Sequence, residues 1–272
     1  MFIIGERINS TRKFIREAVL KKDADFIKME ATKQLQAGAH MLDVNGGIAG
    51  QEVEMLSWLV NVVQEVCDAP LCLDSSDPEA LKKALPLCKQ PPMINSITEE
   101  PERFNALLPL IRDHKTKVIA LCMAASGPPT GMQDRVDTAS RLVDRLLAGG
   151  LAADNIYVDP AVFPVSTGSD QGPAVLNAIS EIRKRYPEAH TSCGVSNVSF
   201  GLPQRKLLNE VFLIMLMSRG MDAAIIDPTD FGLAARIMAA KALRGEDDFC
   251  VNYVRAFKQG KLEFIKTEAP AP

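Results

Sequence analysis

Residues 194–203 read Gly-Val-Ser-Asn-Val-Ser-Phe-Gly-Leu-Pro, and the prediction of the fold starts from this stretch. It begins as an apolar, strand-like run, breaks at Gly201 and Pro203, and leads into a long apolar helix. The hydroxyl of Ser196 and the amide of Asn197 stand where the strand should be most apolar. Such groups are costly at the end of a buried strand unless a ligand or a protein partner satisfies them. Asn197 and Ser199 could also simply cap the turn, so the stretch alone leaves both interpretations open.

The same succession of apolar run, polar residue and helical pattern recurs along the chain. The other predicted strands cover residues 2–4, 41–45, 71–74, 93–96, 118–123, 156–160 and 222–228. Eight short strands alternating with helices in a chain of 272 residues predict an α/β fold, a single (β/α)₈ TIM barrel. An extra amphipathic helix is expected over residues 248–258. A doubly wound sheet is the alternative, but no G-x-G-x-x-G follows the first strand.

Composition excludes several classes of protein. No linker divides the chain, so we predict one domain over residues 1–265 and a disordered tail over residues 266–272. The net charge is −3, and no basic stripe with aromatic residues suggests nucleic-acid binding. The longest apolar run, residues 211–217, is too short to span a membrane. Glu6 and Arg7 follow the N-terminus so closely that we expect no signal peptide.

The cysteines point to a reducing compartment. The six cysteines lack C-x-x-C spacing, and several lie in apolar runs. We therefore expect buried thiols in a cytoplasmic protein and no metal bound by this chain.

The predicted strand ends contain mostly carboxylates and amides. Active sites of such barrels lie at the carboxyl ends of the strands. The polar residues at these positions are Glu6, Asn9, Asp43, Asn45, Asp74, Ser75, Asn95, Ser96, Asp159, Ser196, Asn197 and Asp227. No Lys stands there to form a Schiff base, and no Gly-rich loop or cation cluster is placed to hold a diphosphate. Such a ring suits a neutral heterocycle rich in N–H donors, because carboxylates accept hydrogen bonds and amides both donate and accept them.

Each of these residues also has a structural interpretation. Asp159 and Asp227 precede proline, and Asp-Pro commonly starts a turn. Asp43 and Asn45 could hold loops by hydrogen bonds. Asp74 could cap a helix, although the Asp before Pro78 is better placed for that.

Two further alternatives remain open from the residues. Glu6 and Arg7 could form an ion pair at the barrel mouth. The carboxylates Asp43, Asp74 and Asp159 could instead hold Mg²⁺ in a lyase.

Six motifs at strand ends carry a resemblance to a known family. They are Gly5-Glu6-Arg7-Ile8-Asn9, Leu42-Asp43-Val44-Asn45, Leu73-Asp74-Ser75, Ile94-Asn95-Ser96, Val158-Asp159-Pro160 and Gly194-Val195-Ser196-Asn197-Val198-Ser199. In this order they resemble the pterin-binding methyltransferase family, which includes the methyltetrahydrofolate:corrinoid/iron–sulfur protein methyltransferase and the folate domain of cobalamin-dependent methionine synthase.

The resemblance implies a homodimeric barrel that binds tetrahydrofolate or 5-methyltetrahydrofolate in its mouth. Asp74, Asn95 and Asp159 match the residues that hold the pterin, and Asn197 matches the asparagine at the methylated N5. Asn197 and Asp159 are the expected catalytic pair, anchoring a water network that delivers the N5 proton. The remaining expected substrate-binding residues are Glu6, Asp43, Asn45, Ser96, Gly194, Ser196, Arg205 and Asp227.

The implied reaction moves a methyl group between N5 of tetrahydrofolate and the cobalt of a corrinoid. The chain lacks Asp-x-His-x-x-Gly, the corrinoid-binding signature, so the corrinoid (cobalamin) is expected on a separate partner protein. A dihydropteroate synthase-like enzyme is the alternative, but it needs cations where this chain has Ser196-Asn197 and Asp227-Pro228. A non-catalytic folate-binding protein is the other alternative. The direction of transfer stays open.

Overall fold

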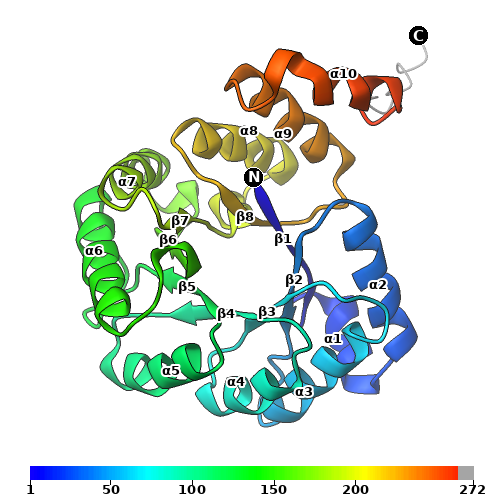
Figure 1. The fold of residues 1–272 in the computed structure, drawn as a ribbon, viewed down its shortest axis with the longest axis vertical. Helices are drawn as coiled ribbons and strands as arrows, with labels where there is room; N and C mark the ends of the chain where they lie inside the picture. The colour runs from blue at the N-terminus through cyan, green and yellow to red at the C-terminus, as the bar shows by residue number, and fades with distance from the viewer. Residues whose placement is uncertain (263–272) are drawn as a thin grey trace.

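The computed structural model describes residues 1–262, so the predicted tail at 266–272 lies outside the described residues. The strands are β1 (Phe2–Asn9), β2 (Met41–Asn45), β3 (Leu71–Asp74), β4 (Met93–Ile97), β5 (Lys117–Leu121), β6 (Ile156–Asp159), β7 (His190–Thr191) and β8 (Ala223–Ile226). They form one eight-stranded sheet of parallel neighbours, ordered β7-β6-β5-β4-β3-β2-β1-β8. The sheet curls into a ring surrounded by helices (Figure 1), which confirms the predicted (β/α)₈ barrel.

The helices follow the strands as their sequence patterns predict. They are α1 (Lys13–Lys21), α2 (Ala24–Gln36), α3 (Glu52–Val63), α4 (Pro78–Ala84), α5 (Pro101–Asp113), α6 (Met132–Ala148), α7 (Gln171–Arg185), α8 (Arg205–Ser218), α9 (Phe231–Leu243) and α10 (Val251–Lys258). At the start of α4, Asp77 accepts a hydrogen bond from the backbone N–H of Glu79, and Pro78 takes the first helical position. Asp74 is therefore not needed as the cap.

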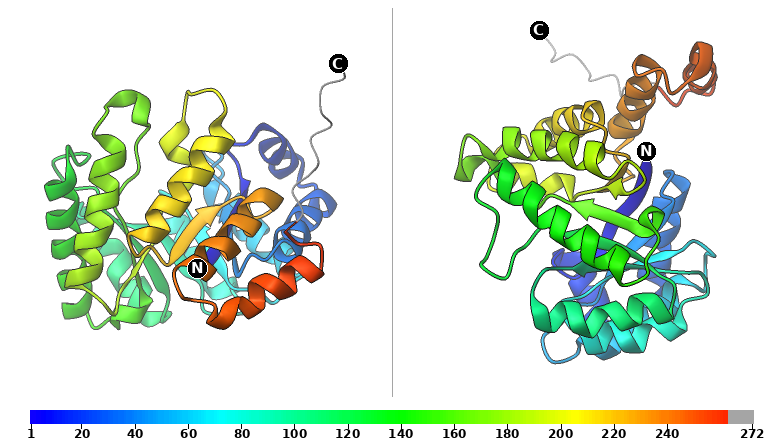
Figure 2. Two further views of the ribbon diagram at one scale, coloured as in Figure 1. Left: turned by 90° about the horizontal axis from the view of Figure 1, so that it is seen from above. Right: turned by 60° about the vertical axis from the view of Figure 1, so that its left-hand side comes forward.

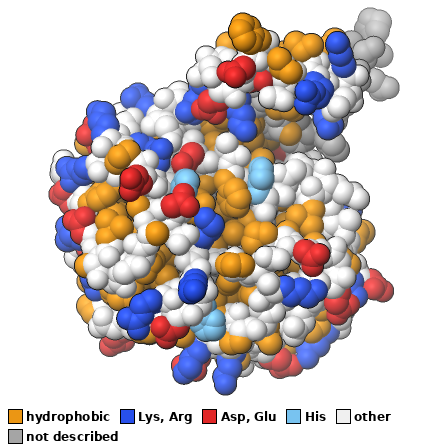
Figure 3. All heavy atoms as spheres, in the orientation of Figure 1, with side chains coloured by type: hydrophobic (Ala, Val, Ile, Leu, Met, Phe, Trp, Pro, Cys, Tyr) orange, Lys and Arg blue, Asp and Glu red, His pale blue; other side chains and the backbone are white. Residues whose placement is uncertain are grey.

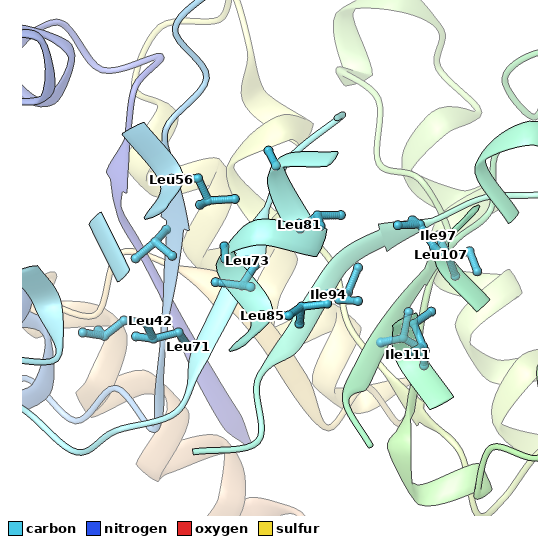
Figure 4. Packing of buried hydrophobic residues seen from close by; sticks show 14 of the residues in the cluster. Leu42, Leu56, Leu71, Leu73, Leu81, Leu85, Ile94, Ile97, Leu107 and Ile111 are labelled. Carbon is cyan, nitrogen blue, oxygen red and sulfur yellow. The ribbon is translucent and has the colours of Figure 1, made fainter. Parts of the chain in front are cut away.

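The two faces of each strand have different environments. Outward side chains pack against the helices, as Figure 4 shows for Leu73 beside Leu81 and for Ile97 beside Leu107. Inward side chains fill the barrel as a separate apolar cluster around Met41, Met93 and Tyr157.

Alternation along the strands then places polar residues above that inner layer. Successive strand residues point to opposite faces, so a residue two positions on points the same way. The inward pairs are Ile4 and Glu6, Met41 and Asp43, Cys72 and Asp74, Met93 and Asn95, and Tyr157 and Asp159. The inner core is therefore apolar at one level and acidic or amidic at the carboxyl ends of the strands.

The seventh strand differs from the prediction. The strand is the two-residue β7, and residues 195–199 form a 3₁₀ turn, η4 (Val195–Ser199). The chain leaves the ladder after Thr191, and a bridge between Gly194 and Ile225 joins the two ends of the sheet. A hydrogen bond of 3.0 Å from the Ile225 N–H to the Cys193 carbonyl supports this closure. The apolar residues of the stretch are buried by the turn, which explains why it resembles a strand in the sequence.

The helices after β7 and β8 carry apolar side chains on their outer faces. In α8, Phe212 and Leu216 are buried, whereas Val211 and Met215 are 51% and 44% exposed. The predicted extra helix is confirmed as α10, which packs on α9 and projects from the ring (Figures 1 and 2).

Two predictions made from composition can be compared with the surface. On the face shown in Figure 3, acidic and basic side chains are interspersed rather than gathered into a basic stripe. Among residues 1–262, no helix is both long and apolar enough to cross a membrane. The six cysteines are free, but the prediction that all are buried is wrong, because Cys250 is exposed at the surface turn before α10.

Candidate active site

A cavity of about 1040 Å³ opens at the carboxyl ends of the strands. It collects residues from every strand except β7, together with the turn η4 and the start of α8. The predicted site residues in its lining are Glu6, Asp43, Asp74, Asn95, Ser96, Asp159, Gly194, Ser196, Asn197, Arg205 and Asp227. Only Asn45, among the predicted set, lies outside the lining.

Asp74 is held from behind by two amides. The Asn45 side chain donates to Asp74 Oδ2 at 3.0 Å, and the Asn9 side chain approaches the same oxygen at 3.4 Å. Asn45 Oδ1 accepts from the backbone N–H of Gly47 at 2.9 Å, which fixes the orientation of the amide. Asn45 therefore has the structural role that the sequence left open, and it orients Asp74 toward the cavity.

Asp43 lies deeper and interacts with the neighbouring strand. It is 2% exposed, and the Asn95 side chain donates to its Oδ1 at 3.2 Å. Burial and the nearby charge of Asp74 raise the pKa of Asp43 well above its ordinary value. Burial also raises the pKa of Asp74, although the hydrogen bond from Asn45 opposes this. Since like charges this close disfavour double ionisation, each carboxylate makes ionisation of the other less favourable.

Asp159 is a buried carboxyl with a pKa near neutrality. Its Oδ1 accepts from the backbone N–H of Ala161 at 2.8 Å, which is the turn expected for Asp-Pro. Burial raises the pKa of Asp159 to about 7, although hydrogen bonds from the backbone of Ala161 and Gly194 act in the opposite direction. The carboxyl is thus fixed in orientation and can exist in either protonation state near neutral pH.

Asn197 lies on η4 and is exposed to the cavity. The turn positions its backbone, since the Asn197 N–H donates to the Gly194 carbonyl at 3.3 Å. No hydrogen bond to its side-chain amide exists among residues 1–262, so both polar atoms remain available to a ligand. A side chain on Gly194 would lie 3.2 Å from the Asn197 amide nitrogen, tighter than most such contacts, so this position favours glycine.

Arg205, at the start of α8, ties the same turn to the helix. Its Nη2 donates to the Ser196 carbonyl at 2.8 Å, and its Nε donates to Ser199 Oγ at 3.1 Å. Its guanidinium also lies 5.7 Å from the ring centroid of Phe200, an exposed aromatic residue in the cavity lining. These contacts order the wall that carries Asn197.

Charged groups from both chain ends meet at the rim. The Glu6–Arg7 ion pair, which the sequence left open as an alternative, does not form, because consecutive strand residues point to opposite faces. Glu6 pairs with Arg12 at 2.9 Å. Arg7 pairs instead with Glu30 at 2.6 Å and with Asp227 at 2.9 Å.

Asp227 also forms the turn expected of an Asp before proline. Its Oδ1 accepts from the backbone N–H of Thr229 at 3.0 Å and from the Thr229 hydroxyl at 2.6 Å. Burial alone would raise the pKa of Asp227, but these hydrogen bonds and the charge of Arg7 hold it below its ordinary value. Asp227 is thus a paired carboxylate in the lining.

Arg103, which the sequence does not mark as a site residue, holds the loops that follow Asp74 and Asn95. From α5, its guanidinium donates to the carbonyls of Ser75 at 2.9 Å, Ser76 at 2.6 Å and Ser96 at 2.8 Å. These carbonyls follow Asp74 on β3 and Asn95 on β4. Nothing in the sequence marks an arginine in the first turn of a helix as the holder of two distant loops.

The lining also includes Arg12, Lys206, Asn209 and Glu210, none of which was predicted. No group of three or more His, Cys, Asp or Glu residues that could hold a metal ion occurs within the described part of the chain. The cavity therefore presents acceptors, the three carboxyls of raised pKa (Asp43, Asp74 and Asp159) and the free amide of Asn197. This set can bind the N–H edge of a flat heterocycle and can exchange a proton with it.

Comparisons with known proteins agree with this geometry. Residues 5–227 match a protein family described as "pterin binding enzyme". The methylcorrinoid:tetrahydrofolate methyltransferase of Eubacterium limosum is 38% identical over 265 residues, covering 96% of this chain and 98% of that protein. The methionine synthase of Mycobacterium tuberculosis is 32% identical over 240 residues, covering 83% of this chain but only 20% of that longer protein.

Solved structures of dihydropteroate synthases share the fold. The Coxiella burnetii enzyme in complex with pteroic acid has a TM-score of 0.72 at 16% identity, covering 90% of this chain and 94% of that chain. At this identity the likeness concerns the fold alone. Residues 5–227 match the family, and one relative is 38% identical over nearly the whole chain. The chain therefore belongs to the pterin-binding enzyme family.

Proposed function

We propose that this protein transfers a methyl group between N5 of tetrahydrofolate and the cobalt of a corrinoid carried by a separate protein. The observation that carries the proposal is one cavity that combines Asp74, Asn95 and Asp159 with the free amide of Asn197. The relative from Eubacterium limosum, whose name states this chemistry, supports it over nearly the whole chain. Either direction of transfer is compatible with the same residues, because catalysis lowers one barrier for both.

Asp74, Asn95 and Asp159 are the residues proposed to hold the pterin. The 2-amino and ring N–H groups of a pterin are donors, and the ionised carboxyls of Asp74 and Asp159 are acceptors. Asn95 can accept with its oxygen while its nitrogen donates to Asp43. Glu6, Asp43, Ser96, Gly194, Ser196, Arg205 and Asp227 complete the proposed binding surface.

Asn197 and Asp159 are proposed to support the chemical step. A tertiary amine is a poor leaving group, so N5 must gain a proton or a hydrogen bond as the methyl group leaves. An amide can donate to the unprotonated N5 and, after rotation, can accept from N5–H. Because the Asn197 amide has no hydrogen bond to another described residue, that rotation breaks no hydrogen bond within residues 1–262.

The experiment follows the spectrum of cobalamin during a single turnover. The purified protein is mixed with 5-methyltetrahydrofolate and Co(I) cobalamin, and then, separately, with tetrahydrofolate and methylcobalamin. We expect methyl transfer in at least one direction. Tight folate binding without transfer in either direction would favour the non-catalytic folate-binding alternative, and formation of pteroate from p-aminobenzoate would favour the synthase alternative.

We also propose that the protein is a homodimer that receives the corrinoid from a partner protein in the cytoplasm. The exposed Val211 and Met215 on the outer face of α8 support an interface there. Light scattering at micromolar concentration should give twice the chain mass, and Val211→Glu should shift it toward the monomer. A monomer mass for the wild type would contradict the dimer. The free cysteines are consistent with a reducing compartment.

A further inference from the structure

Glu6 faces the cavity between the first strand and the turn that carries Asn197. Its side chain is 16% exposed, and each carboxyl oxygen has a different partner. Arg12 Nη2 lies 2.9 Å from Oε1, and the Ser196 hydroxyl donates to Oε2 at 3.4 Å. Glu6 is thereby connected to Ser196, the residue that precedes Asn197.

Glu6 has fewer positive neighbours than the other carboxyls of its charge cluster. The cations of this cluster are Arg7, Arg12 and Lys33, and its carboxyls are Glu6, Glu30 and Asp227. Arg7 lies between Glu30 and Asp227, and Arg12 lies 3.6 Å from Asp227 as well as close to Glu6. Glu30 pairs with Arg7 and Lys33, whereas Glu6 pairs among the described residues with Arg12 alone and shares it with Asp227.

The surroundings of Glu6 disfavour its ionised form. Burial raises the pKa of Glu6 above its ordinary value despite the charge of Arg12, and the charge of Asp227 raises it further. Asp43, on the neighbouring strand, also faces it with a like charge when ionised. Asp227 is held ionised by Thr229 and by the arginines. Glu6 therefore combines a raised pKa with a position that faces the cavity.

We propose, on the basis of the function proposed above, that Glu6 stores the proton that N5 of the folate gains or loses, and that the Ser196 hydroxyl relays it. When the methyl group leaves, the N5–C bond breaks and its electron pair stays on N5. N5 takes the hydroxyl proton of Ser196, Ser196 takes the proton of Glu6, and the new carboxylate is stabilised by Arg12. The methyl group forms its new bond to Co(I). In the opposite direction, each proton moves back and Glu6 becomes protonated.

Asp159 is less suited to this task. Its carboxyl is held by the backbone N–H groups of Ala161 and Gly194, which orient it as an acceptor for the pterin. Glu6 instead has one oxygen directed at a hydroxyl, which can both donate and accept. Glu6 acts through Ser196 and is therefore a positioning residue whose protonation state matters.

The kinetic test compares Glu6→Gln, Glu6→Asp and Ser196→Ala with wild type at saturating folate. Glu6→Gln keeps the shape but cannot exchange a proton, so the single-turnover rate should fall about a hundredfold. Its folate affinity should stay within about threefold, a difference below 1 kcal/mol. Glu6→Asp should recover much of the rate and the dependence of rate on pH, both of which Glu6→Gln loses. Ser196→Ala should also lower the rate with little change in affinity.

The matched control is Glu30→Gln, the same change at the other end of the charge cluster and outside the cavity. It should keep the wild-type dependence of the rate on pH. Glu6→Gln with weakened folate binding and an unchanged saturated rate would overturn the proposal. The same holds if Glu30→Gln removes the pH dependence as Glu6→Gln does.

A binding measurement tests the proton without methyl transfer. Calorimetry of 5-methyltetrahydrofolate binding, in two buffers of different ionisation enthalpy, counts the protons taken up on binding. We expect wild type to take up more than Glu6→Gln, because the bound pterin further desolvates Glu6. Equal proton uptake in the two proteins would overturn the proposal. If wild type binds folate but transfers no methyl group, the proposed function fails, and this difference still decides whether Glu6 is protonated.

Discussion

The two ends of the barrel contain the same kinds of polar side chain but satisfy them differently. Where the strands begin, His190 lies between Asp222 at 2.8 Å and Asp154 at 3.0 Å, and its ring stacks on Tyr157. Where the strands end, the Asn197 amide makes no hydrogen bond to any other described residue. Polar groups paired within the protein stabilise the fold, whereas unpaired groups in a cavity are available to a ligand.

The pKa values of two aspartates, one at each end of the barrel, are shifted in opposite directions. Burial would raise the pKa of Asp222, but hydrogen bonds from His190 and Thr191 hold it below its ordinary value. Burial raises the pKa of Asp159 to about 7. The ionised form of Asp222 is therefore favoured by folding, and that of Asp159 is disfavoured. At the cavity end, burial of Asp159 therefore lowers the stability of the fold when this carboxyl is ionised, and the carboxyl titrates near neutral pH.

The largest expected effect comes from Asn197→Ala. We expect the single-turnover rate at saturating folate to fall about a hundred- to a thousandfold, the usual effect of losing one group that stabilises developing charge. Folate affinity should change much less. Asn177→Ala, at an exposed position on α7, is the matched control. A saturated rate within about threefold of wild type would make Asn197 a binding residue rather than a catalytic one.

A smaller effect is expected from Asp159→Ala on folate affinity. Loss of a charge-assisted hydrogen bond should weaken binding about ten- to a hundredfold, measured by titration calorimetry. Because the carboxyl must be ionised to accept from the pterin, wild-type affinity should rise as the pH rises toward about 7 and level off above it. Asp222→Asn, at the other end of the barrel, should leave affinity unchanged. Wild-type affinity in Asp159→Ala would refute this placement.

Arg103→Met should lower folate affinity by about tenfold, which corresponds to the free energy of roughly one hydrogen bond. The carbonyls of Ser75 and Ser96 would lose their donor, and the loops after β3 and β4 would relax. The rate at saturating folate should stay within about threefold. Arg103→Lys should recover part of the affinity, and Arg112→Met on the same helix should have no effect. If Arg103→Met and Arg112→Met lowered folate affinity equally, Arg103 would have no specific role in positioning these loops.

The smallest expected effect is at the opposite end, in His190→Gln. Hydrogen bonds to Asp222 raise the pKa of His190 despite burial. The charged form therefore stabilises the fold below pH about 6.5, and this stabilisation is lost as the pH rises through the higher folded pKa. The variant should melt about 2–4 °C lower than wild type near pH 6 and closer to it at high pH. Methyl transfer should be unchanged, and a lower rate would contradict the division between the two ends.

Much of the site could be predicted because the pattern of apolar and polar residues shows where the strands end. Asp43, Asp74 and Asn95 each stand two residues after an inward apolar residue, so local alternation already directs them into the barrel. The turn at Asp159 and the cap at Asp77 are also local, since their hydrogen bonds span two residues.

Other features could not be predicted because they depend on distant partners. The predicted seventh strand is a turn, since the Gly194 region bridges Ile225 on the last strand instead of extending the ladder. Arg103 was missed because its acceptors belong to loops that precede it in the chain. Cys250 was predicted to be buried, but its flanking turn turns it outward.

By itself the sequence determined the alternation of strands and helices and the level at which polar residues replace apolar ones. These follow from periods of 2 and about 3.6 residues and from caps and turns, all of which involve near neighbours. Only the tertiary structure decided which polar groups pair with one another. Arg7 reaches Asp227 because barrel closure brings β1 beside β8. The same closure leaves Glu6 facing Ser196 and the amide of Asn197 without a partner among the described residues.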